Sequence, residues 1–200
     1  MRRRIGVGCI LLGILCLLLS AGFVVYNYIE AQSAEESSKT MLQDVQKKIR
    51  QNIQEETAPD TTGSEALPAK AVALEIDGYA CIGILSIPVL EIELPVLDQW
   101  SYEKLKKAPC QYFGSCYDSD FVIAAHNYPS HFGRLSELQP GDLVTFTDTE
   151  GAVYCYEVVL RETLPPTATE EMITSGFDLS LYTCTPGGGN RVTVRCKICD

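Results

Sequence analysis

The stretch 180–195, SLYTCTPGGGNRVTVR, places a cysteine and an arginine on either side of a short turn. Cys184 ends a run that is typical of a β-strand, and Arg191 begins the next such run. The glycines between them allow positive φ angles and a close approach of a substrate chain. If the second strand pairs back on the first, Arg191 lies beside Cys184. Its guanidinium, which stays charged in proteins, would then favour the nucleophilic thiolate and hold a developing oxyanion.

A third chemical group lies earlier in the chain. His126 ends the apolar run FVIAA and precedes the loop NYPSHFG, so we expect it at the end of a strand, facing a loop. Catalytic groups are often found on loops that a rigid scaffold holds in place. Taken alone, His126 is more simply an ordinary loop histidine. Together, His126, Cys184 and Arg191 supply a proton carrier, a nucleophile and a stabilising cation, each at a strand end.

The last predicted strand, RVTVRCKI, alternates in polarity. One face carries Val192, Val194, Cys196 and Ile198, and the other carries Arg191, Thr193 and Arg195. The apolar face is expected to join the core. We expect Arg195 to lie on a solvated face.

The cysteines allow other interpretations. Cys196 and Cys199 have the C-x-x-C spacing of thiol–disulfide exchange proteins, although redox pairs usually open a helix rather than end a strand. A metal site using the same two thiols lacks a second ligand pair. Of the nine cysteines, Cys9 and Cys16 lie in the apolar N-terminal segment, and the spacing of the others does not determine which of them pair. The apolar strand runs place Cys81, Cys155 and Cys196 in the core.

The N-terminus has the pattern of a membrane anchor. Residues 5–26 carry no charge, and a helix of this length spans the hydrocarbon layer of about 30 Å. Arg2, Arg3 and Arg4 precede it, so residues 1–4 are expected in the cytoplasm and the rest of the chain outside the cell. A cleaved signal peptide is the alternative, with AQSA at 31–34 as a cleavage site, but its apolar core would be about 7–15 residues.

The next segment, 27–75, is polar and is expected to be a stalk or linker. Leu42, Val45, Ile49 and Ile53 follow helical spacing, which predicts a weakly amphipathic helix, and simple disorder is the alternative. The formal net charge of the chain is −10, which argues against nucleic acid as a partner.

Residues 76–200 form the expected folded domain. Short runs rich in Val, Ile, Leu and Tyr alternate with Pro, Gly, Asp and Ser, which predicts a closed all-β barrel or a sandwich. Short helices are predicted at 101–108, after a Ser101 cap, and at 169–176, where Glu170 and Glu171 lie at the positive end.

These motifs resemble the sortases, the membrane-anchored cysteine transpeptidases of Gram-positive bacteria. The family signature Thr-Leu-x-Thr-Cys is present as 180–184, SLYTC, with Ser in the first position, and CTPGGGNRVTVR is similar to the turn and arginine strand that follow. VIAAHNYPSHFGRLSELQPGD is similar to the stretch around the family's histidine, and IGILSIPVLEIELPV to its opening strands. The resemblance covers about residues 79–198.

The resemblance implies an all-β, closed eight-stranded barrel with one or two short helices, preceded by a transmembrane helix. It implies that Cys184 is the nucleophile, His126 the general acid/base and Arg191 the stabilising cation, because Arg191 takes the first position of the family's Arg-x-x-x-Arg strand. The implied reaction cleaves the Thr–Gly bond of a sorting signal similar to Leu-Pro-x-Thr-Gly. A thioester then transfers the secreted protein to an amine of a cell-wall precursor or of another pilin.

The resemblance also implies substrate contacts at Thr183, Leu164 and Pro165, with Pro166 and Met172 as further candidates for an apolar wall. Some sortases bind calcium near this region, but helix N-terminal acids account for Glu170 and Glu171, so we expect no metal and no cofactor. The expected partners are proteins bearing sorting signals, an amine acceptor and the membrane, and the sortase subclass stays open. An inactive β adaptor of the same family would look similar, although all three chemical positions are filled.

Overall fold

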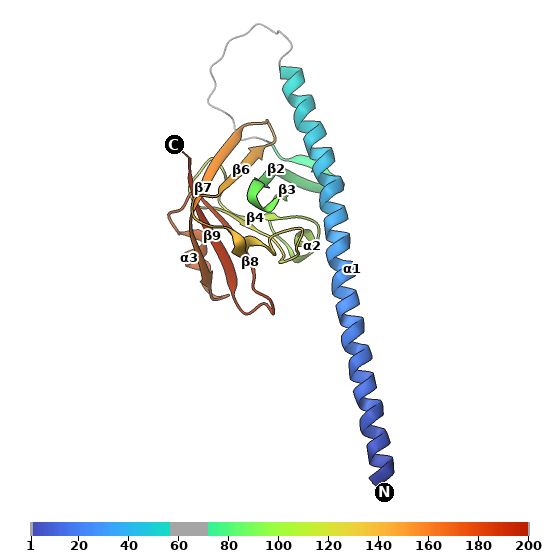
Figure 1. Cartoon of the computed structure of the whole chain (residues 1–200). Helices are drawn as coiled ribbons and strands as arrows, with labels where there is room; N and C mark the ends of the chain where they lie inside the picture. Colours follow the sequence, from blue (N-terminus) through green and yellow to red (C-terminus); the bar gives the residue numbers. More distant parts are fainter. Residues whose placement is uncertain (1, 57–71, 200) are drawn as a thin grey trace.

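The computed structural model describes residues 2–56 and 72–199, and combines one long helix with a β-barrel beside it (Figure 1). The long helix is α1 (Arg2–Glu56). Two short helices are α2 (Tyr102–Leu105) and α3 (Thr169–Ile173), and the 3₁₀ turns are η1 (Pro88–Leu90) and η2 (Leu135–Glu137). The strands are β1 (Leu74–Ile76), β2 (Tyr79–Ile87), β3 (Ile92–Leu97), β4 (Cys110–Phe113), β5 (Phe121–Ala124), β6 (Leu143–Asp148), β7 (Val153–Leu164), β8 (Leu179–Cys184) and β9 (Arg191–Ile198).

The sheet closes on itself. Its order is β1-β2-β3-β4-β5-β8-β9-β7-β6, and β6 also pairs with β2, so eight strands form a ring and β1 is added at the edge of β2. The eight-stranded barrel expected from the sequence is confirmed. Closure satisfies the backbone hydrogen bonds at the edges that an open sheet would leave unpaired.

One parallel pair matters for the rest of the molecule. β5 and β8 run parallel, with Ala124 opposite Tyr182, whereas β8 and β9 form an antiparallel hairpin. The carboxyl ends of parallel neighbours lie at the same edge of a sheet. The residues that follow β5 and those that end β8 therefore meet at one end of the barrel.

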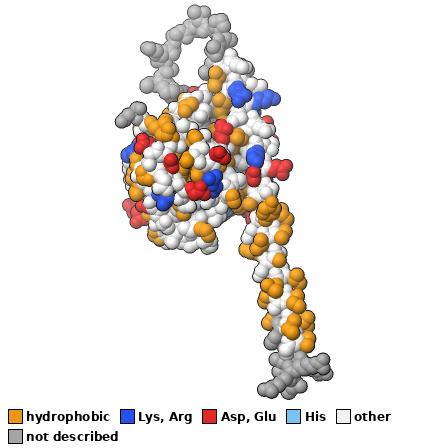
Figure 2. All heavy atoms as spheres, viewed as in Figure 1, with side chains coloured by type: hydrophobic (Ala, Val, Ile, Leu, Met, Phe, Trp, Pro, Cys, Tyr) orange, Lys and Arg blue, Asp and Glu red, His pale blue; other side chains and the backbone are white. Residues whose placement is uncertain are grey.

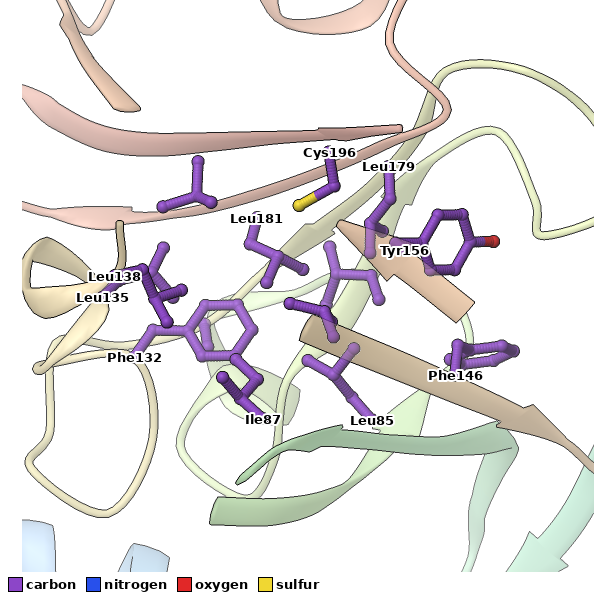
Figure 3. Close-up of a cluster of buried hydrophobic side chains, with 14 of the residues drawn as sticks. Leu85, Ile87, Phe132, Leu135, Leu138, Phe146, Tyr156, Leu179, Leu181 and Cys196 are labelled. Atoms are coloured by element: carbon purple, nitrogen blue, oxygen red, sulfur yellow. The ribbon is translucent and has the colours of Figure 1, made fainter. Parts of the chain in front are cut away.

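The barrel interior is filled by alternating side chains of its strands and by the segment around η2 (Figure 3). Leu179 and Leu181 of β8 point into this core, as their period-2 spacing requires. Phe121 and Phe146 meet edge to face with ring centroids 5.1 Å apart. Phe132 and Leu135, from the loop that follows β5, are fully buried here, so the core itself fixes this loop.

A second core lies outside the ring, between α1 and the barrel. Met41, Val45 and Ile49 of α1 are buried against side chains of β1 to β5 and of the α2 region: Ile76, Cys81, Ile84, Leu97, Leu105, Ala108, Cys110 and Ala124. The segment 34–49 therefore differs from the expected stalk, because it is packed on the barrel. The remaining part of that expected linker, 57–71, lies outside the described residues.

The buried stripe of α1 explains this difference. It consists of Ala34, Ser38, Met41, Val45 and Ile49, at steps of three and four residues. Two of its members are small and only weakly hydrophobic, so the stripe is a poor signal in the sequence. Further toward the N-terminus, a window of α1 within Gly6–Gln54 has a mean hydropathy of 2.7 and is wholly exposed, which suits a membrane span (Figure 2).

The short helices lie where the sequence predicts them. The hydroxyl of Ser101 accepts a hydrogen bond from the backbone N–H of Lys104 at 3.1 Å and caps α2. The other helix, α3, ends at Ile173, and Gly176 then adopts a positive φ of 70° in the turn toward β8.

Candidate active site

Cys184 and Arg191 face each other across the β8–β9 hairpin, where they form the pair nearest the turn. The turn is closed by backbone hydrogen bonds from Thr185 N–H to the Asn190 carbonyl at 2.9 Å and from Gly188 N–H to the Thr185 carbonyl at 2.7 Å. Gly187 and Gly188 have φ values of 84° and 76°, which residues with a Cβ rarely adopt. The glycine run is therefore required by the turn that brings Arg191 back to Cys184.

His126 reaches the same end of the barrel from β5. The Ala125 N–H donates to the Tyr182 carbonyl at 3.1 Å, and the Thr183 hydroxyl donates to the Ala125 carbonyl at 2.8 Å. These bonds tie the residues just before His126 to those just before Cys184. The three predicted catalytic residues thus meet in one place, although they come from three strands.

The three side chains line one cleft with a volume of about 160 Å³. Its floor includes Ala124 and Ala125. One wall comes from the segment between β7 and β8 and consists of Pro165, Pro166, Ala168, Thr169 and Met172. The opposite wall is aromatic and consists of Trp100, Tyr102, Tyr112 and Tyr182. The rings of this wall touch one another in sequence, with centroids 5.3–5.8 Å apart, so it forms a continuous apolar surface.

The surroundings of His126 favour its neutral form. Burial lowers the pKa of the imidazole, the Glu30 carboxylate raises it, and the Lys106 ammonium lowers it. Its Nε2 atom is buried and has no hydrogen-bond partner within the described part of the chain. A neutral imidazole with a free nitrogen in the cleft can accept a proton from a substrate amine or from the thiol.

The predicted substrate-binding residues are divided. Pro165, Pro166 and Met172 line the cleft, whereas Leu164 and Thr183 are not among its lining residues. Thr183 is 3% exposed, and its hydroxyl is occupied by the Ala125 carbonyl. Its place is therefore behind the catalytic strand ends, where it joins β8 to the residue before His126.

The aromatic wall was not predicted from the sequence. Trp100 and Tyr112 lie more than 70 positions before Cys184, and β3 and β4, which bracket α2, pair in parallel through a single position, Leu97 opposite Cys110. A pairing this short leaves no periodic signal in the sequence. The cluster of Trp and Tyr between 100 and 112 was the available clue.

The expectation that Arg195 lies on a solvated face is wrong. Its side chain is 2% exposed and forms an ion pair with Glu162 at 2.8 Å. It also donates to the Ser180 hydroxyl at 2.8 Å and to the carbonyls of Glu171 and Met172 at 2.7 and 3.3 Å. The α3 segment covers this face of β9, and Arg195 fastens it to the barrel. Arg191 is the arginine that reaches the cleft.

The cysteines outside the cleft have structural surroundings. Cys155 forms a disulfide with Cys199, with a Cα–Cα distance of 5.4 Å, and Cys196 is fully buried in the barrel core. Cys155 is half-buried and bonded to Cys199, so the prediction that it lies in the core is wrong. Neither the exchange protein nor the metal site drawn from Cys196 and Cys199 fits this arrangement, because the two sulfurs serve different parts of the fold.

Comparison with known proteins agrees with this geometry. The chain shares its fold with the Clostridium perfringens sortase D5 transpeptidase (TM-score 0.59, 16% identity, covering 82% of this chain and 99% of that one). It is also similar to sortase C-3 of Streptococcus pneumoniae (0.55, 23%, 85% and 90%) and to sortase C1 of Streptococcus suis (0.52, 29%, 60% and 73%). A comparison with curated protein sequences gives no match. The family model described as the sortase domain matches residues 85–199, more than half of the chain, and the chain therefore belongs to the sortase family.

Proposed function

We propose that this sortase transpeptidase cleaves a C-terminal sorting signal similar to Leu-Pro-x-Thr-Gly at its Thr–Gly bond and transfers the acyl part to an amine. The observation that carries the proposal is the convergence of Cys184, His126 and Arg191 in one cleft with apolar walls. A nucleophile, a proton carrier and a fixed cation are the parts that acyl transfer requires.

In the first half of the reaction, His126 accepts the proton of the Cys184 thiol, and the thiolate sulfur attacks the carbonyl carbon of the scissile bond. The Arg191 guanidinium donates hydrogen bonds to the oxyanion that forms, and its charge stabilises the tetrahedral intermediate. Collapse of the intermediate breaks the C–N bond, and His126 gives its proton to the leaving amine. The product is a thioester between the substrate carbonyl and Cys184.

In the second half, His126 accepts a proton from the incoming amine as its nitrogen attacks the thioester carbonyl. The C–S bond breaks, the new amide forms and the Cys184 thiolate is restored. No oxidant or metal is needed for this balance. The acceptor is an amine of a cell-wall precursor or of another surface protein.

The aromatic wall and the wall formed by the segment between β7 and β8 support binding of an extended, partly apolar peptide. Pro165, Pro166 and Met172 line the same cleft as the rings of Trp100 and Tyr182. A peptide with a leucine and a proline can bury both side chains between such surfaces, and each buried apolar side chain contributes on the order of 1.5–3 kcal/mol.

The apolar part of α1 supports attachment to a membrane. We propose a single-pass anchor with residues 1–4 in the cytoplasm and the barrel outside the cell, because three arginines precede the apolar run. Both the enzyme and a substrate carrying a sorting signal would then be held at the same membrane surface, which raises their effective concentration.

The first prediction concerns the nucleophile. The full chain in detergent, given a quenched sorting-signal peptide and a short amine acceptor, is expected to release the fluorophore and to form the amide product. Cys184→Ala should lower kcat/KM by more than about 10³-fold, because the covalent intermediate cannot form. Mass spectrometry of the wild-type protein without acceptor should show the thioester.

The matched control is Cys116→Ala, which removes another partly exposed thiol of the barrel outside the cleft. This variant should cleave the peptide at the wild-type rate. Persistent cleavage by the Cys184→Ala protein would exclude Cys184 as the nucleophile. Absence of cleavage by the wild-type protein on every sorting peptide would overturn the proposed substrate class.

A further inference from the structure

The membrane helix touches the loop that carries the catalytic histidine. Glu30 is the first charged residue after Arg4, and its Oε1 atom lies 2.8 Å from the Lys106 Nζ atom just past α2. Both charges act on His126, in opposite directions, and both also act on Tyr128 in the same loop. The ion pair between α1 and Lys106 therefore contributes to the electrostatic surroundings of His126.

The next turns of α1 are buried against the same loop. Ala34 and Ser38 are 1% and 2% exposed, and the backbone of Ala34 lies beside the ring of His131, which is fully buried. Glu35 and Ser38 share a surface groove with Ser130. Helix α1 thus covers the far side of the loop that leads away from His126.

The contact continues through adjacent, tilted rings to His126. The rings of His131 and Tyr128 have centroids 5.5 Å apart, and those of Tyr128 and His126 are 4.9 Å apart. Burial and the neighbouring His126 lower the pKa of His131 to about 4, so His131 remains neutral at physiological pH. His131 therefore packs between α1 and Tyr128 as a neutral ring. The charges that act on His126 from this side are those of Glu30 and Lys106.

We propose that the face of α1 formed by Glu30, Ala34 and Ser38 is part of the active site, and that Glu30, paired with Lys106, is a positioning residue that biases the protonation state of His126. The inference rests on the proposed function, because it assigns Glu30 a part in the same proton transfer. It also gives α1 a role beyond attachment, since the helix brings a fixed carboxylate to the cleft.

The expected signs follow from the groups that face His126. Glu30 on α1 favours the imidazolium, Lys106 after α2 opposes it, and Tyr128 and His131 of the loop are neutral near pH 7. Glu30→Gln leaves Lys106 without its counter-charge, so the pKa of His126 should fall further. Lys106→Gln leaves Glu30 alone beside the imidazole, so the pKa should rise.

The second prediction is tested by NMR titration of the histidines in the full chain, reconstituted in lipid nanodiscs. The chain has two histidines, so the spectrum is assigned with a single His126→Gln sample. The midpoint of His126 should move to lower pH in Glu30→Gln and to higher pH in Lys106→Gln. Glu36→Gln, the same change on an exposed position of the same helix, should leave the midpoint unchanged.

The kinetic counterpart is the alkaline limb of the kcat/KM profile, where loss of the His126 imidazolium removes the acid for the leaving amine. This limb should shift in the same directions as the NMR midpoints, whereas a merely structural role of Glu30 would lower activity without moving it. Unchanged midpoints in both charge variants would overturn the inference. The titration needs no substrate, so this outcome is distinct from failure of the proposed reaction.

Discussion

Arg191 and Arg195 lie four residues apart on β9 and have opposite surroundings. Arg191 lines the cleft, and its side chain donates to the carbonyls of Gly188 and Asn190 in the adjacent turn. Arg195 is buried in a complete set of partners, with Glu162 as its counter-charge. The two arginines therefore differ: Arg191 is available to the cleft, and Arg195 stabilises the fold.

The third prediction separates these two roles. Arg191→Lys keeps the charge but loses the planar donor fork, so kcat/KM should fall by roughly 10²-fold, as for loss of one oxyanion donor, with little change in stability. Arg195→Met leaves the Glu162 carboxylate without its counter-charge and should destabilise the barrel by about 3 kcal/mol. Peptide cleavage and denaturant unfolding of both proteins test the division. Full activity in Arg191→Lys would reassign the stabilising role.

At the scale of single residues, the sequence was informative where the residues of a motif lie close together in the chain. Cys184, the glycine turn and Arg191 occupy a few consecutive positions, so their juxtaposition follows from one hairpin. The prediction for Arg195 was wrong because its burial depends on α3 folding over β9. The alternation of polar and apolar residues along a strand does not show whether another element covers its polar face. Trp100 was missed for the same kind of reason, since its neighbours in the cleft are distant in sequence.

The elements of the barrel were more predictable than the packing of α1. Seven of the strand-like runs correspond to β2, β3 and β5 to β9, because their apolar residues are β-branched and bounded by turn residues. The short strands β1 and β4 have no such pattern. The stripe of α1 was partly recognised at Val45 and Ile49, but its continuation through Ser38 and Ala34 is too weakly hydrophobic to distinguish a docked helix from a stalk.

The fourth prediction concerns this packing. Ile49 is 5% exposed and lies near Gly151, in the turn between β6 and β7. A Cβ atom at Gly151 would collide with Ile53, so α1 packs tightly against this turn. Ile49→Ala keeps helix propensity and removes buried methyl groups, so it should lower the free energy of unfolding by about 2–4 kcal/mol. The fluorescence of Trp100, the only tryptophan, reports unfolding of the full chain in detergent.

The control for this change is Arg50→Ala on the adjacent, exposed position of the helix. It should alter the free energy of unfolding by no more than about 0.5 kcal/mol. Equal stability of the Ile49→Ala and wild-type proteins would show that α1 is not part of the cooperative unit.

At the scale of the whole molecule, α1 fixes the height of the cleft. Glu30 lies four positions after Tyr26, the end of the apolar run, which corresponds to about 6 Å along a helix. Figure 1 shows the barrel held against the C-terminal half of this single helix, without a hinge between the apolar part and the docked part. The cleft of an anchored molecule is therefore close to the membrane surface.

The fifth prediction tests this height. Seven helix-forming residues inserted after Asn27 would raise the barrel by about 10 Å and turn it by only about 20°, while every contact from Tyr28 onward is kept. Cleavage of a substrate held in the same vesicle should fall several-fold. Cleavage of a soluble peptide should stay at the wild-type rate, and equal losses on both substrates would point instead to damage of the site.

The surroundings of the cysteines offer a way to measure the fraction of active enzyme. Burial raises the pKa of Cys81 and Cys116 to about 11 and that of Cys110 and Cys196 to about 12, and the disulfide occupies Cys155 and Cys199. An alkylating reagent in water therefore reaches Cys184 and Cys116, the two partly exposed thiols among the described barrel cysteines. In the Cys116→Ala protein, one equivalent of label on the barrel would measure the fraction of competent enzyme in any preparation, before a substrate has been identified.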